Sequence, residues 1–151
     1  MVTARTTITQ LGSQICVNDR KEHLVPALGN NTSKPGDVCG IDETNGRVMG
    51  TDDGLAGSDE FIGILKEHVL YGVDAVIPTD VPCSLIVPKS GNRYRIRILD
   101  TVDIEPSGTP LWFSATAGKL DETDASAETC CARLSMPTLT NDDTVAEVTW
   151  D

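Results

Sequence analysis

Basic and aromatic residues are both scarce in this sequence. Lysine and arginine number 12 against 23 aspartates and glutamates, which gives a formal net charge of −11, and aromatic residues make up only 4% of the 151 residues. Binding to nucleic-acid phosphates needs clustered basic side chains, so nucleic acid is not expected as a partner. Because aromatics are few, the core must be built mainly from valine, isoleucine, leucine and alanine.

Long apolar runs are missing as well. No stretch of 18 apolar residues occurs, so the sequence predicts no membrane-spanning helix and no membrane partner. Residues 1–8 lack the apolar core of a secretory signal. We therefore expect the protein to be made in a cytoplasm and to stay there, or in a particle assembled there.

The sequence also lacks the usual signatures of metal sites and catalysis. Neither His23 nor His68 has a second ligand at zinc spacing, no Cys-x-x-Cys pair occurs among the five cysteines, and no Gly-x-Ser-x-Gly or phosphate-binding loop is present. Two acidic stretches could offer oxygens to calcium but lack the regular Asp-x-Asp-x-Asp-Gly spacing, so solvated loops are favoured. Their acidic residues are Asp52, Asp53 and Asp59 in one and Asp121, Glu122 and Asp124 in the other. We expect no metal, no cofactor, no enzyme activity and free, buried thiols.

What the sequence does contain is a succession of short strand signals. Tyr94, Ile96 and Ile98 alternate with arginines, as expected for a strand with one buried face. Similar runs, separated by glycine and proline turns, lie at 37–41, 47–50, 61–66, 83–87, 94–99, 110–114, 129–136 and 144–150. This spacing predicts an all-β protein, either a small β-barrel or a sandwich of short antiparallel strands.

A weak internal repeat accompanies these strand signals. Residues 35–87 and 107–148 each contain a glycine-led strand, a hairpin, an acidic loop, a further strand, a Pro-Thr turn and a closing strand. In the first copy the hairpin signal is Asn45-Gly46, a dipeptide typical of tight turns. Two explanations of this similarity stay open. Either the chain has two related halves, or features common to all β chains resemble each other by chance.

The domain organisation follows from where the strand pattern begins. We expect one domain, with an N-terminal arm and first strands over 1–31 and a β domain over 32–151. The threonine-rich start suits an extended arm that adds a strand to a neighbouring sheet, although a frayed terminus is the alternative. The candidate partner-binding residues of the arm are Thr3, Arg5, Thr7 and Thr9.

A second candidate binding surface is the longest basic cluster of the sequence. Arg93, Arg95 and Arg97 alternate along one strand and therefore share a face. Such a face is either simply solvated or contacts an acidic partner surface.

Several segments together resemble a known class of β proteins. They are Pro35-Gly-Asp-Val, Gly46-Arg-Val, Phe61-Ile-Gly-Ile-Leu, Gly108-Thr-Pro-Leu-Trp-Phe and Ala117-Gly-Lys-Leu. Their arrangement resembles the small β-barrel decoration, or cement, proteins of tailed-virus capsids. The resemblance implies a virion protein that forms a homotrimer on the outer capsid surface. There it would bridge major capsid protein subunits and stabilise the shell, after assembly in the host cytoplasm.

Two other functions remain as alternatives. One is a different virion or cell-surface structural module, such as a tail, spike or adhesin domain. The other is an all-β trimeric enzyme, because 85–91 looks like the Pro-Arg-Ser-Gly segment of trimeric dUTPases and 71–76 resembles their catalytic aspartate segment. The order of the two segments is reversed here and the glycine-rich C-terminal arm is missing, so the enzyme is the less favoured alternative.

Overall fold

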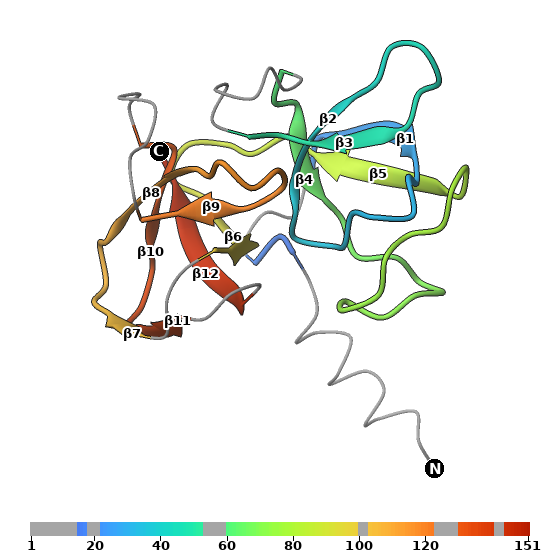
Figure 1. Cartoon of the computed structure of the whole chain (residues 1–151). Coiled ribbons are helices and arrows are strands. Elements are labelled where there is room, and N and C mark those ends of the chain that lie inside the picture. The colour runs from blue at the N-terminus through green and yellow to red at the C-terminus, as the bar shows by residue number, and fades with distance from the viewer. Residues whose placement is uncertain (1–14, 18–21, 53–59, 100–102, 123–129, 141–143) are drawn as a thin grey trace.

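A computed structural model describes residues 15–17, 22–52, 60–99, 103–122, 130–140 and 144–151. Within these ranges all regular secondary structure is β, and no helix there could cross a membrane. The all-β prediction is therefore confirmed (Figure 1). The candidate arm residues Thr3, Arg5, Thr7 and Thr9 lie outside the described residues.

The described chain forms twelve short strands. They are β1 (Leu24–Leu28), β2 (Val38–Ile41), β3 (Val48–Gly50), β4 (Gly63–Leu65), β5 (Pro82–Ile86), β6 (Arg93–Ile98), β7 (Asp103–Glu105), β8 (Pro110–Phe113), β9 (Leu120–Asp121), β10 (Ala132–Leu134), β11 (Thr138–Thr140) and β12 (Thr144–Trp150). Each of the eight predicted runs overlaps one of these strands, and β1 lies in the segment 1–31, where first strands were expected. The two-residue β9 and the short β7 and β11, which pair with each other, were not predicted.

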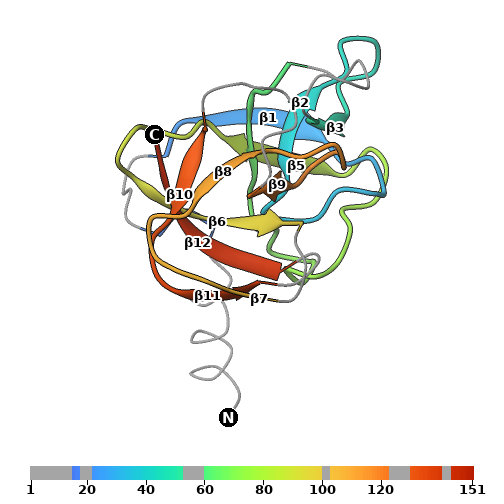
Figure 2. The ribbon, with the colours of Figure 1, turned by 60° about the vertical axis from the view of Figure 1, so that its left-hand side comes forward.

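Ten of the strands form two sheets with the same topology. The first sheet has the order β1-β5-β4-β2-β3, and the second has the order β6-β12-β10-β8-β9 and closes into a barrel through parallel pairing of β6 with β9. The first sheet approaches the same closure, because Leu28 of β1 and Arg47 beside β3 form a parallel bridge. Figure 2 shows the two bodies packed against each other.

The shared topology extends to individual residues. Gly36 and Gly108 both have a left-handed backbone, with φ of 92° and 87°, and each donates its N–H over 2.8 Å, to Leu65 O and Leu134 O respectively. Gly46 and Gly118, at the two hairpins, also share positive φ values of 74° and 90°. Only glycine adopts this conformation without a steric penalty, which explains the glycine pattern of the sequence. The internal repeat is therefore a true structural repeat.

The two halves pack in a head-to-tail manner. The interior of the first sheet forms its own core, whereas Val38, Ile64 and Ile86, which are neighbours on its outer face, are fully buried in the core of the barrel. The residues at equivalent positions of the second half are Pro110, Arg133 and Thr149, none of which is buried. One outer face is thus covered and its counterpart is solvated.

Two described parts of the segment 1–31 belong to the folded body. Ile15 and Cys16 belong to the barrel core, with Ile15 fully buried, and β1 is an edge strand of the first sheet. Ile15 O accepts a hydrogen bond from Arg95 N over 2.7 Å, so the short segment 15–17 pairs alongside β6.

The backbones of the two halves approach closely at Gly50. A Cβ atom there would lie 2.8 Å from Gly118 N and 2.9 Å from the carbonyl carbon of Ala117. We expect Gly50→Ala to lower the free energy of unfolding by about 1–3 kcal/mol, because backbone atoms must shift to admit the methyl group. Urea denaturation measures this change.

Gly72→Ala is the matched control, since a Cβ at Gly72 meets nothing within 4 Å and its φ is not in the left-handed range. Its unfolding free energy should stay within about 0.5 kcal/mol of the wild type. Equal stability of the two variants would contradict the close approach.

Candidate functional site

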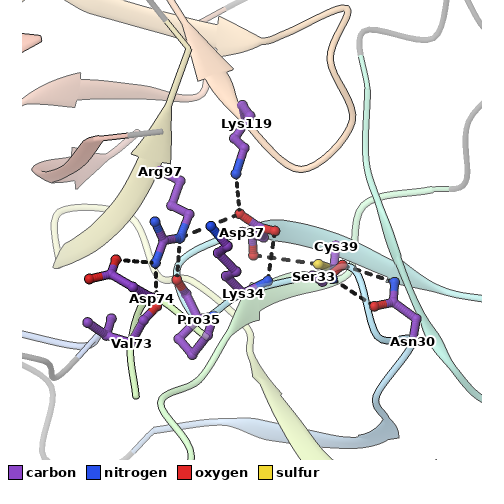
Figure 3. A network of polar contacts seen from close by, with 10 residues as sticks. All are labelled: Asn30, Ser33, Lys34, Pro35, Asp37, Cys39, Val73, Asp74, Arg97 and Lys119. Carbon is purple, nitrogen blue, oxygen red and sulfur yellow. Dashed lines mark hydrogen bonds and ion pairs between the residues drawn. The ribbon is translucent and has the colours of Figure 1, made fainter. Parts of the chain in front are cut away.

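A buried polar cluster joins the two halves (Figure 3). Its centre is Arg97 near the end of β6, together with Asp37 just before β2 and Lys119 just before β9. Tyr94, Ile96 and Ile98 fill the barrel interior, so the alternation of the strand directs the arginines to the opposite face. At the Arg97 end of β6, the loop 35–37 of the first half lies against this face. Arg97 N donates a hydrogen bond to Gly36 O over 3.0 Å there.

The Arg97 guanidinium is fully engaged and only 1% exposed. Its Nε donates to Pro35 O over 2.9 Å and lies 3.9 Å from Asp37 Oδ1. Its Nη2 donates to Val73 O and, over 3.2 Å, to Asp74 Oδ1. One side chain of the barrel therefore fastens two loops of the first half.

This burial corrects the prediction for the arginine face. Arg97 was expected on a solvated or partner-binding face, but the loops 35–37 and 73–74 cover that end of the strand. Arg93, at the other end, is half exposed and forms an ion pair with Glu147 over 3.2 Å, and Arg95 is partly buried. Of the three arginines, Arg93 and Arg95 keep exposed surface and stay candidates for partner binding.

Asp37 is the acidic partner of the cluster. Its Oδ2 accepts a hydrogen bond from Lys34 N over 3.0 Å, and its Oδ1 accepts one from Lys119 Nζ over 3.0 Å. Burial raises the pKa of Asp37 above its usual value of 3.8, although Lys119, the Lys34 N–H and Arg97 oppose the shift. The contacts connect residues from both halves, so the cluster holds them in one orientation.

A neutral extension of the cluster runs into the first half. Asn30 Oδ1 accepts hydrogen bonds from Thr32 N and Ser33 N, and its Nδ2 donates to Val48 O over 2.8 Å. Cys39 Sγ donates to Asp37 O over 3.6 Å. These contacts stabilise the turn that leads the chain from β1 into Asp37.

None of the five cysteines forms a disulfide, and Cys16, Cys39 and Cys83 are buried as expected, whereas Cys130 and Cys131 are only partly buried. Burial raises the pKa of Cys39 strongly and raises the pKa of Cys83 to about 11. Since the thiolate is the nucleophile, neither thiol is activated. Cys131 packs against the barrel core, whereas Cys130 contacts Asp151.

The described acidic residues do not form a cation site. Of the residues considered for calcium, Asp53, Asp59 and Asp124 lie outside the described ranges, and Asp52 is buried. Among the residues that the structure describes, no three histidine, cysteine, aspartate or glutamate side chains come close enough together to hold a metal ion.

The two dUTPase-like segments lie at opposite ends of β6. Asp74, in the segment 71–76, contacts Arg97, whereas the segment 85–91 ends just before Arg93. The four-residue step along an extended strand corresponds to roughly 13 Å. The structure therefore does not bring these two segments together in one site.

Sequence reasoning missed Asp37 as a partner of Arg97 and Lys119 as a second partner of Asp37. Both missed residues are charged and follow a positive-φ glycine, in Gly36-Asp37 and Gly118-Lys119. The two glycines are not equivalent in the repeat, since Gly36 corresponds to Gly108 and Gly118 to Gly46, so the repeat does not link them. The pairing across the halves could not be predicted, because it depends on how the halves pack.

The cluster predicts a large stability difference between two arginines on the same strand. Arg97→Met should lower the free energy of unfolding by about 3–5 kcal/mol, because it leaves the carbonyl oxygens of Pro35 and Val73 without their donor and removes one of the two cations beside the buried Asp37. Arg93→Met, at the exposed ion pair, should cost about 1 kcal/mol or less. Urea denaturation of both variants measures the difference, and similar losses would show that Arg97 is not a structural cross-link.

The pKa of Asp37 predicts a specific pH dependence. A raised folded-state pKa means that the folded protein binds this proton more tightly than the unfolded chain. The contribution of Asp37 to stability should therefore increase as pH falls through the raised pKa towards 3.8. Wild type should gain stability relative to Asp37→Asn over this window in urea denaturation at several pH values.

The titration of Asp37 can also be followed directly by NMR of its carboxyl carbon. A midpoint above 3.8 is expected. A midpoint below 3.8 would mean that Lys119 and Arg97 outweigh the burial of the carboxyl group.

No protein-family model matches the chain, and no curated protein is similar to it in sequence. The function is therefore inferred from the repeat, the polar cluster and the surface of the chain itself.

Proposed function

We propose that the chain is a capsid decoration protein, or cement protein, that binds the outer surface of a viral shell and bridges its major capsid subunits. The observation that carries the proposal is the structural repeat: two copies of one five-stranded unit, one made of β1–β5 and the other of β6, β8, β9, β10 and β12, held in a single body. A viral shell displays one subunit many times at fixed spacing. A protein with two related units in fixed orientation suits such a repeating surface.

The polar cluster supports this proposal by making the body rigid. Arg97 and Lys119 of the second half both contact Asp37 of the first half, and Val38, Ile64 and Ile86 are buried between the halves. When two binding units are held rigidly, the second contact forms without a further loss of orientational freedom. The described polar groups of the cluster serve the fold, which is the pattern expected of a structural protein.

Further contacts are assigned to surfaces predicted from the sequence. The arm residues Thr3, Arg5, Thr7 and Thr9 would add a strand to a neighbouring sheet edge, where backbone hydrogen bonds supply affinity. Arg93 and Arg95 would contact acidic groups of the partner. A homotrimer would multiply these contacts through avidity.

The proposal is tested by particle association. The protein should co-purify with capsids from infected cells in a stoichiometric amount, and immunogold label should lie over the capsid surface. Label over tails or spikes would instead indicate another structural module of the virion. Absence from particles combined with hydrolysis of dUTP by the purified protein would indicate the enzyme.

Deletion of residues 1–10 tests the arm. We expect lower occupancy of capsids and an unchanged melting temperature, because the described core begins at Ile15. Capsid occupancy is measured by gel densitometry after sedimentation with purified particles. Full occupancy by the truncated protein would exclude the arm as a contact.

Light scattering tests self-association. At micromolar concentration the free protein should have three times the mass of the 16.1 kDa chain. A monomer under these conditions would contradict a trimer that forms before attachment.

A further inference from the structure

The barrel is completed by a segment that lies far from it in the sequence. At one end of β6 the barrel closes through the pairing of Ile98 with Leu120 of β9. At the other end residues 15–17 lie along the same strand, where Cys16 forms an antiparallel bridge with Tyr94 (Figure 1). We call residues 93–95 of β6 the strand slot and residues 15–17 the guest segment.

Hydrogen bonds to both halves hold the guest segment. Arg95 N donates to Ile15 O over 2.7 Å, and Val17 N donates to Arg93 O over 3.0 Å. Ile15 N donates to Glu67 Oε2 of the first half over 3.1 Å. The guest segment is therefore bound as an added strand, the mode in which extended peptides bind to sheet edges.

Burial of apolar side chains adds to these hydrogen bonds. Ile15 is fully buried and Cys16 is 6% exposed, both as members of the barrel core. Their partners lie on β6 and just after β4, far from residue 15 in the sequence. None of these contacts depends on the continuity of the chain, so the guest segment of another copy can make the same contacts.

The strand slot has a fixed length. Antiparallel pairing beyond Arg95 would next use the N–H of Arg97 on this edge of β6. That N–H already donates to Gly36 O over 3.0 Å. The slot therefore takes one short strand and ends at the loop 35–37.

The corresponding edge of the first half cannot bind a strand in the same way. In the register of the repeat, Pro26 of β1 corresponds to Arg95 of β6, because β1 pairs with β5 as β6 pairs with β12. Arg95 supplies the N–H that bonds to Ile15 O, whereas proline has no N–H to donate. The guest segment is thus directed to the barrel.

The connection between the guest segment and the first half is short. Only residues 18–21 separate Val17 from Glu22, and Glu22 forms an ion pair with Lys66. Lys66 Nζ also lies 3.7 Å from Glu67 Oε1. Short connections of this kind favour the exchange of a segment between copies, since exchange keeps every contact and lets the connection extend.

We propose that residues 15–17 of one copy fill the strand slot of a second copy, so that this chain associates with itself by exchanging its guest segment. Each copy then offers a guest segment to one neighbour and its strand slot to another, and such an arrangement closes into a ring. Under the proposed function the ring is the homotrimer, and the inference rests on that function for the number of copies alone. It adds the contact through which the copies are joined.

A disulfide trap in the full chain tests the exchange. Val17 and Arg93 lie opposite each other in the pairing, so Val17→Cys/Arg93→Cys places two thiols across the slot. After oxidation with copper phenanthroline, a non-reducing denaturing gel should show covalent dimers and trimers. The single variants Val17→Cys and Arg93→Cys are the matched controls for links through native thiols such as Cys130. A disulfide that joins positions 17 and 93 within single chains would overturn the proposal.

A longer connection provides a second test that needs no oxidation. Insertion of Gly-Ser-Gly-Ser-Gly-Ser between Asp19 and Arg20 lets the guest segment reach the slot of its own chain. Light scattering at micromolar concentration should then show a monomer with the melting temperature of the wild type. The same insertion between Glu43 and Thr44, in the exposed hairpin between β2 and β3, is the control and should leave the oligomer intact. A monomeric wild type, or an oligomer that survives the first insertion, would refute the exchange.

These results separate the inference from the proposed function, because neither measurement involves capsids. Links within single chains would refute the exchange and leave the decoration function standing. Linked chains that never appear on particles would confirm the exchange and refute the decoration function.

Discussion

The orientation of the two halves depends on the buried guanidinium of Arg97. It belongs to a strand of the barrel, yet its side chain contacts the loops 35–37 and 73–74 of the first half. A cation without water must be surrounded by acceptors in the right places, and only one arrangement of the loops supplies them. The apolar contact through Val38, Ile64 and Ile86 buries surface between the halves. Arg97 fixes the angle at which the two halves meet.

Much of the fold could be predicted because strand alternation and turn chemistry are local. The strands that end at Ile41, Ile86 and Trp150 are each predicted by residues only a few positions apart. The glycines of the repeat likewise mark the turns that need a positive φ. The paired strands β7 and β11 could not be predicted, since each has only three residues and depends on the other.

The polar cluster shows where local reasoning ends. The spacing of Arg93, Arg95 and Arg97 correctly gives one face of the strand, but it cannot tell which end of that face another part of the chain will cover. Arg97 is buried and Arg93 is not, although both belong to the same row of alternating arginines. The difference arises from the packing of the halves, which is a property of contacts distant in sequence.

The head-to-tail packing of the halves has a consequence for assembly in solution. A contact between unlike faces of two related units can in principle be repeated without limit, and such contacts generate filaments. In this chain the stacking of units stops at two, because the apolar outer face of the first half has no apolar counterpart in the second. Val38, Ile64 and Ile86 are replaced there by Pro110, Arg133 and Thr149. Arg133 and Asp151, 3.6 Å apart, occupy the place where a third unit would otherwise stack. The second half thus ends the stack with a polar face, in the way that polar end repeats cap solenoid proteins.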